Sequence, residues 1–294
     1  MQLKIVPSFL MLLVYFSLYA QEATEIYLFD LIQTEDSYEL TNPKNISDNP
    51  GYDNQPSFTE DGGSILYTSI RDGQADIVLY DIGLNFKTWI TDTPEDEYSP
   101  KPYPKKKKNY TCVRKEKNGT QLLYKYAFKN NKPEVLLPNI QVAYYTWFDD
   151  KILITYIIDE DTEILQVDNF KYKLKYMLQF KIGRSFQRVP GTDLISYISK
   201  SHETPEIYVI NPNNSEKKYI IDAFEGSEDM VWTNEGTILM GLGNKMFKYN
   251  PKTDKNWDEI KIISDLPVED ISRLAVSPDG KKIAVVVAEV KKEE

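Results

Sequence analysis

Carboxylate side chains recur along the chain just before short apolar segments, and they are the residues with the clearest chemical potential. They are Asp53, Glu97, Glu228, Asp229, Glu269 and Asp270. Arg184 occupies the corresponding place in the segment KIGRSF and belongs to the same candidate binding set. If folding brings these positions to one opening, a concave site with one dominant sign of charge would attract an oppositely charged ligand. We therefore expect an acidic funnel for a basic or amine-bearing peptide segment, unless Asp53 and its counterparts only stabilise turns by accepting backbone N–H bonds.

Residues that mark hydrolases are scarce in the sequence. A Ser-His-Asp site needs a histidine oriented by a third group, and the only histidine is His202, in the polar segment SKSHETPEI. The sequence contains no Gly-x-Ser-x-Gly motif, which would mark an α/β-hydrolase nucleophile. The only cysteine, Cys112, lies in NYTCVR, where alternation predicts a strand, and we interpret it as a small buried hydrophobic residue. No catalytic residue is assigned, and we predict a protein that is not an enzyme.

The segment DEDTE is the one stretch whose spacing of carboxylates suggests a metal ligand set. It places Asp159, Asp161 and Glu163 at alternate positions, and carboxylate oxygens suit calcium. The segment lacks the central glycine of an EF-hand loop and falls where a hairpin tip is expected. We therefore predict no cofactor and no metal site, with calcium as the one ion that these residues would suit.

The elements that must position these residues follow from an internal repeat. Six segments, the last of which is RLAVSPDGKKIAVV, share an apolar strand, a polar turn and a second strand. Their aligned residues are Phe58, Tyr103, Trp147, Val189, Trp232 and Val276. The separations are 45, 44, 42, 43 and 44 positions, a period typical of the four-stranded blades of a β-propeller.

Third and fourth strands follow five of the six hairpins, whereas the sixth hairpin comes last in the sequence. Two segments near the other end, TEIYLFDL at 24–31 and SYELTNPKNIS at 37–47, match the missing strands. The sequence therefore predicts an all-β, six-bladed propeller of four-stranded blades. Its sixth blade would be closed by N-terminal strands at about 24–47 that pair with the C-terminal hairpin at about 271–290.

Two repeats also resemble a known family. The segments 53–82 and 271–287 resemble the propeller repeat of TolB-like periplasmic proteins, in which an Asp precedes a Pro by three residues, a Pro-Asp-Gly turn joins the first strands and RDG precedes the third. The matching residues are Asp53 and Pro56, Asp61 and Gly62, and Arg71 to Gly73. The resemblance implies a rigid envelope scaffold whose partners dock on one face or enter the central channel. TolB has an additional N-terminal domain, which we do not expect here.

The first twenty residues have one charge at Lys4, a mostly apolar run and a small residue, Ala20. This is the layout of a secretory signal peptide, so we predict a signal peptide at 1–20 and a single propeller domain at 21–294. A net charge of −10 argues against a nucleic-acid partner. We expect a periplasmic or secreted monomer, without stable membrane insertion after cleavage.

These observations predict a non-enzymatic exported scaffold that binds an envelope protein or peptide through its channel mouth. The alternative is a metal-dependent propeller hydrolase or lactonase, in which the same acidic residues at the mouth would serve as ligands.

Overall fold

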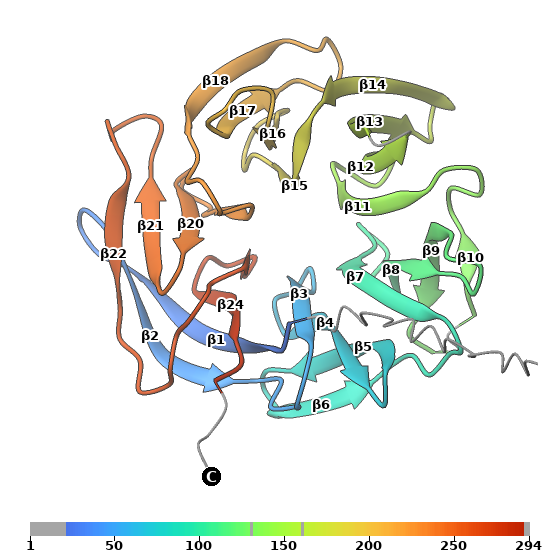
Figure 1. Ribbon diagram of the computed structural model, residues 1–294, viewed down its shortest axis with the longest axis horizontal. Coiled ribbons are helices and arrows are strands. Elements are labelled where there is room, and N and C mark those ends of the chain that lie inside the picture. The colour runs from blue at the N-terminus through green and yellow to red at the C-terminus, as the bar shows by residue number, and fades with distance from the viewer. Residues whose placement is uncertain (1–21, 130–131, 160–161, 291–294) are drawn as a thin grey trace, which may run out of the picture.

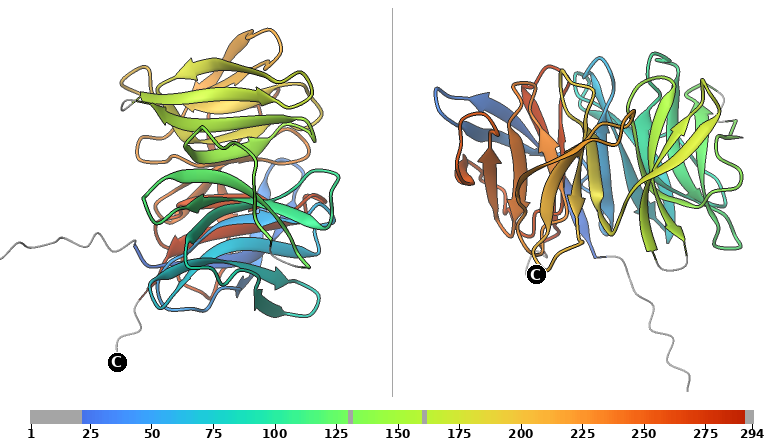
Figure 2. Two further views of the ribbon diagram at one scale, coloured as in Figure 1. Left: turned by 90° about the vertical axis from the view of Figure 1, so that its right-hand side faces the viewer. Right: turned by 90° about the horizontal axis from the view of Figure 1, so that it is seen from above.

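The protein is a ring of small β-sheets around a central axis (Figure 1). Its structure, a computed structural model, describes residues 22–129, 132–159 and 162–290, which contain 24 strands. The predicted signal peptide lies outside the described residues. Within the described ranges, no helix is long and apolar enough to span a bilayer. Figure 2 shows the ring from two sides, with strands running through its thickness.

Four of the sheets are separate and have four strands each. The first contains β3 (Asp53–Phe58), β4 (Ser64–Arg71), β5 (Gln74–Asp81) and β6 (Phe86–Trp89). The second contains β7 (Asp96–Pro102), β8 (Asn109–Lys115), β9 (Gln121–Ala127) and β10 (Glu134–Val135). The third contains β11 (Val142–Trp147), β12 (Ile152–Asp159), β13 (Thr162–Asn169) and β14 (Leu174–Phe180). The fourth contains β15 (Ile182–Arg188), β16 (Ile195–Ser199), β17 (Glu206–Ile210) and β18 (Lys217–Asp222).

The fifth sheet has eight strands and consists of two four-stranded units. One unit contains β19 (Met230–Trp232), β20 (Ile238–Leu242), β21 (Lys245–Tyr249) and β22 (Asp258–Ile262). The other, which we call the closing unit, contains β23 (Arg273–Val276), β24 (Lys282–Ala288), β1 (Thr24–Gln33) and β2 (Tyr38–Asn45). Together with the four separate sheets, these units account for the six predicted repeats.

The fusion of the last two units differs from the six separate blades that the sequence predicts. Strands β2 and β22, the outermost of their units, pair in parallel at Glu39↔Lys261 and Leu40↔Ile262. The backbone N–H of Ile263 also donates to the carbonyl of Leu40 at 2.8 Å. The reason is packing: Leu40 is fully buried in a cluster that includes Leu239 and Met246 of the neighbouring unit. Placing its side chain there brings the two outer backbones within hydrogen-bonding distance.

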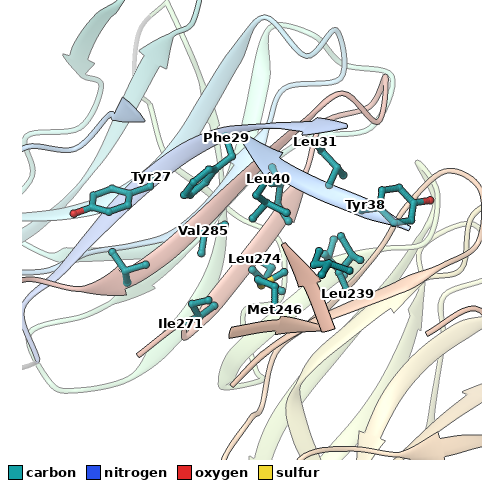
Figure 3. Close-up of a cluster of buried hydrophobic side chains, with 14 residues drawn as sticks. Tyr27, Phe29, Leu31, Tyr38, Leu40, Leu239, Met246, Ile271, Leu274 and Val285 are labelled. Carbon is teal, nitrogen blue, oxygen red and sulfur yellow. The ribbon is translucent and has the colours of Figure 1, made fainter. Parts of the chain in front are cut away.

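The predicted closure by both ends of the chain is confirmed. Strands β1 and β24 pair antiparallel from Thr24↔Ala288 to Asp30↔Lys282, and Lys282 Nζ lies 2.7 Å from Asp30 Oδ1. Alternate side chains of β1 point into the cluster of Figure 3, where Phe29 packs near Val285 of β24. The outer edge of the C-terminal hairpin is therefore covered, as an exposed strand edge requires.

Burial changes across each unit from the axis outward. Middle strands such as β4 are buried on both faces, because neighbouring sheets cover them. Outer strands such as β14 are mostly exposed, and there Leu174 and Met177 face solvent. The β-branched and aromatic residues of the middle strands suit this doubly covered position.

Residues within one position of equivalence in successive repeats contact each other around the ring. Ser99 N donates to Gln55 Oε1 at 2.7 Å across 44 positions, and Lys105 Nζ lies 2.8 Å from Asp150 Oδ1 across 45 positions. Five of the six aligned residues are buried at the ends of the innermost strands, and the sixth, Val276, is partly buried. The repeat found in the sequence is thus the spatial repeat of the ring.

Candidate functional site

A cavity of about 70 Å³, which we call the axial pocket, lies where the innermost strands converge. Each repeat contributes the residue three positions before its aligned residue. These lining residues are Gln55, Pro100, Tyr144, Phe186, Asp229 and Arg273. Further lining comes from Ser99, Lys101, Arg184 and Gln187, among others. One pocket therefore collects side chains from all six repeats.

Local irregularities of the innermost strands shape this pocket. The pairing register shifts between Asn54 and Ser57 in β3 and between Tyr98 and Lys101 in β7. Within these bulges Gln55 and Ser99 adopt left-handed backbone angles, with φ of 59° and 53°. A bulge bends the strand and redirects a side chain, and non-glycine residues hold such angles only where their surroundings fix them. Hydrogen bonds fix Gln55 here, because its Oε1 accepts from Ser99 N at 2.7 Å and from Thr68 Oγ1 at 3.1 Å.

The charged lining of the axial pocket consists of Lys101, Arg184, Arg273 and Asp229. The carboxylate of Asp229 is 8% exposed and accepts a hydrogen bond from Leu274 N at 3.1 Å. Burial raises the pKa of Asp229, and the nearby Arg273 and Arg184 guanidinium groups offset part of this rise. Burial lowers the pKa of Lys101, and Asp229 opposes that shift.

The two arginines are held in place from the side. The guanidinium of Arg273 lies over the ring of Tyr144, 5.0 Å from its centroid, an arrangement that orients a cation by cation–π attraction. Arg184 donates from Nη2 to the carbonyl of Ser272 at 3.1 Å, whereas its buried Nε makes no hydrogen bond within the described residues.

The structure separates the seven residues of the predicted binding set. Arg184 and Asp229 line the axial pocket. Glu228 lies at a neighbouring cavity, 3.9 Å from Arg184 Nε, and forms an ion pair with Lys200. Glu269 and Asp270 are exposed between β22 and β23 and are not among the residues that line either cavity. The ligand-binding role of this set stays a prediction.

Asp53 in β3 and Glu97 in β7, the other two members, are fully buried and are not among the residues that line the axial pocket. Burial raises the pKa of each to about 7. Glu97 accepts hydrogen bonds from Thr93 Oγ1 at 2.5 Å and from Tyr126 Oη at 3.0 Å. In the part of the chain that the structure describes, neither oxygen of the Asp53 carboxylate has a hydrogen-bond partner of good geometry, although Ser69 and Asn49 lie close enough to lower its pKa somewhat.

The charge of the axial pocket differs from the acidic funnel expected from the sequence, because its lining contains three cationic groups and one carboxylate. The predicted set contains mainly acidic residues at or before the start of each innermost strand. It therefore omits the cationic residues Lys101 and Arg273. The repeat itself held the signal, because Arg273 occupies the same aligned column as Asp229, and Lys101 lies one position after that column.

The remaining chemical candidates have ordinary surroundings. His202 is exposed between β16 and β17, and its Nδ1 lies 2.6 Å from Glu206 Oε2. Cys112 is buried and unpaired, as interpreted from the sequence, and burial raises the pKa of its thiol. Within the described part of the chain, no three His, Cys, Asp or Glu side chains gather in a way that could hold a metal ion. The calcium interpretation of DEDTE involves Asp161, which lies outside the described residues.

No protein-family model and no curated protein sequence matches the chain. Solved structures show that the fold is that of TolB-like propellers. The structure of a putative TolB from Agrobacterium tumefaciens is 13% identical, with a TM-score of 0.73 over 92% of this chain and 100% of that chain.

More distant similarity extends to propellers of other kinds. A chain of the nidogen/laminin complex is 9% identical, with a TM-score of 0.60 over 90% of this chain and 98% of that chain. An oligogalacturonate lyase in complex with manganese is 11% identical, with a TM-score of 0.57 over 86% of this chain and 83% of that chain. At these identities the likeness concerns the fold alone.

Proposed function

We propose that this propeller is a non-enzymatic scaffold of the cell envelope that binds a protein or peptide segment through one mouth of its channel. The axial pocket supports this proposal most directly. It lies on a closed ring, receives side chains from all six repeats and contains charged groups held by hydrogen bonds and stacking. Sites on rigid elements of this kind bind a partner without ordering a loop first.

The pocket is also accessible from one face. A wider cavity of about 280 Å³ shares Pro56, Lys101, Gln187 and Leu274 with the axial pocket. Its lining includes Asn234 and other residues of the hairpin turns. A peptide that enters from the hairpin-turn face would therefore meet the wide cavity first and the charged groups at its inner end.

Similar propellers and the N-terminal sequence support the same proposal. The nidogen/laminin complex contains a propeller in a protein assembly, and the layout of residues 1–20 supports export to the periplasm or outside the cell. The basic character first expected of the partner rested on acidic residues that the fold places apart.

The test is site-specific photo-crosslinking in cells that export the full chain. A photoreactive residue at Asn234, on the hairpin-turn mouth, should capture a defined partner. The same residue at Lys171, beside the outer strand β14, should not. Equal capture of the same partner from both positions, or capture only from Lys171, would contradict binding through the mouth.

The oligogalacturonate lyase similarity supports a second candidate, a metal-dependent propeller enzyme. Calorimetric titration of the purified protein with Mn²⁺ and with Ca²⁺ separates the two. Tight stoichiometric binding of either ion would favour the enzyme and count against the scaffold, whereas the scaffold predicts no such binding.

A further inference from the structure

We infer that the axial pocket recognises a carboxylate of the bound peptide, through Lys101, Arg184 and Arg273. This inference rests on the proposed function and gives the partner a chemical feature: a free C-terminal carboxylate or an acidic side chain that enters the channel. It replaces the basic peptide expected from the sequence with an anionic group.

The lining of the axial pocket has more positive than negative groups. The pocket lining contains three cationic side chains against the single carboxylate of Asp229. The pocket therefore has an excess of two positive charges. Glu228 and Lys200 form an ion pair at its edge, and this pair has no net charge and leaves the excess unchanged. Cationic groups confined in one pocket repel each other, and an anion placed among them relieves that repulsion.

The hydrogen-bonding groups of the pocket also favour an anionic ligand. One oxygen of Asp229 already accepts from Leu274 N at 3.1 Å. Among the described residues, the buried Nε of Arg184 makes no hydrogen bond, and the Glu228 carboxylate oxygen is 3.9 Å from it. A buried donor without a partner costs free energy, which a bound acceptor would recover. Guanidinium groups match the two oxygens of a carboxylate particularly well.

The pocket also has room for such a group. A cavity of about 70 Å³ can hold several water molecules, because about 10–15 Å³ of such volume is enough for one. A carboxylate group therefore fits inside it. The adjoining cavity of about 280 Å³ would hold the residues that present the carboxylate.

Binding of defined probes to the full mature chain tests the inference. The probes are acetate, trialanine with a free C-terminus, N-acetyl-trialanine amide, and N-acetyl-Ala-Asp-Ala amide, each titrated at low ionic strength and monitored by calorimetry or NMR. Acetate, free trialanine and the Asp peptide contain a carboxylate, whereas N-acetyl-trialanine amide does not. We expect at least one of the three carboxylate probes to bind at least tenfold more tightly than N-acetyl-trialanine amide. A preference for free trialanine would identify a C-terminal carboxylate, and a preference for the Asp peptide an acidic side chain.

Two substitutions should shift the affinity in opposite directions. Lys101→Met should weaken carboxylate binding about tenfold, and Asp229→Asn should strengthen it, because it removes the competing negative charge. Lys245→Met, which changes an exposed lysine paired with Glu259 on the outer side, is the matched control and should leave the affinity unchanged.

The outcomes separate this inference from the proposed function. If peptides bind equally well with and without a carboxylate, or if Lys101→Met binds as the unchanged protein does, the carboxylate inference is wrong while peptide binding stands. If acetate binds in a Lys101-dependent way but no peptide binds, the anion site stands and the peptide scaffold is contradicted. If no probe binds, the carboxylate inference is wrong.

Discussion

The closing unit and the axial pocket are built from the same repeat but contain opposite kinds of side chain. In the closing unit, Phe29, Leu40 and Val285 are completely buried among apolar neighbours from both ends of the chain. In the axial pocket, equivalent positions of the repeats differ from one another and include Asp229 and Arg273. The comparison indicates that the shared pattern of the repeat builds the ring, whereas departures from it at the axis give the molecule its chemical character.

The difference is also one of free energy. Apolar burial stabilises the folded chain in proportion to the area removed from water, so the closing unit should dominate resistance to unfolding. Charged side chains in a confined space contribute little net stability, because desolvation offsets their mutual attraction. The predictions below test this division of roles, beginning with the largest expected effect.

Removing residues 21–49 would test the closing unit most severely. The deletion takes away β1 and β2, so it breaks the pairing with β24 and with β22 and exposes the cluster of Figure 3. We expect the melting temperature to fall by more than about 10 °C, or cooperative unfolding to be lost. Deleting only Glu35 and Asp36, in the exposed turn between β1 and β2, is the control and should change it little. A truncated chain that melts within a few degrees of the intact one would show that the ring does not need this closure.

A single large-to-small substitution should have the next largest effect. Phe29 is 0% exposed, and Phe29→Ala should lower the free energy of unfolding by about 3–5 kcal/mol, because it leaves a cavity in the closing unit. Phe86 in β6 is 64% exposed, and Phe86→Ala should change it by less than about 0.5 kcal/mol. Urea denaturation of both variants measures the two values, and similar losses would mean that the closing unit is not specially important.

The sequence predicted the closing unit better than the axial pocket, for a physical reason. The segment 24–31 and the last strand of the C-terminal hairpin are nearly continuous apolar runs that are buried on both faces. The repeat period leaves them as the two halves of one unit, so their pairing can be inferred without coordinates. The parallel contact of β2 with β22 depends on how two neighbouring units pack, and no local pattern encodes it. The bulges at Gln55 and Ser99 likewise change which residue faces the axis. Acidic residues that precede a strand were therefore a poor guide to the lining.

The effect expected at Asp53 is of intermediate size, because burial outweighs the opposing influence of Lys87 and of nearby hydrogen-bonding groups on its pKa. Its folded pKa is raised to about 7, so the folded chain binds this proton more tightly than the unfolded chain, whose carboxyl titrates near its ordinary value. The neutral carboxyl therefore makes a contribution to folding stability that is fully present below about pH 4 and is lost as pH rises through about 7. Asp53→Asn should therefore be more stable than the unchanged protein at pH 8, by about 1–3 kcal/mol, and this advantage should shrink toward pH 5.

Asp61 provides the control of opposite sign for that experiment. Its hydrogen bonds with Thr59 and Gly63 lower its pKa, so its contribution is present at neutral pH and is lost as pH falls through the lowered folded value. Asp61→Asn should reduce stability at pH 7 and make little difference in strong acid. Denaturation midpoints measured from about pH 2 to about pH 8 give both profiles. An Asp53→Asn advantage that does not grow with pH would rule out the buried carboxylate as its cause.

The smallest effect on the free energy of unfolding is expected at the axial pocket, where it contrasts most clearly with the closing unit. Lys101 lies within β7, where burial lowers its pKa; Asp229 opposes this shift and Arg273 adds to it. Lys101→Met keeps the length and the apolar stem of the side chain. It should leave the free energy of unfolding unchanged or raise it by up to about 1 kcal/mol, because an unfavourable buried charge is removed. Asp229→Asn should instead destabilise modestly, since Arg273 and Arg184 lose their one buried counter-charge. If Lys101→Met cost more than about 2 kcal/mol, the pocket cation would be part of the structural framework. The proposed division between a closing unit that stabilises the ring and an axial pocket that binds a ligand would then be wrong for Lys101.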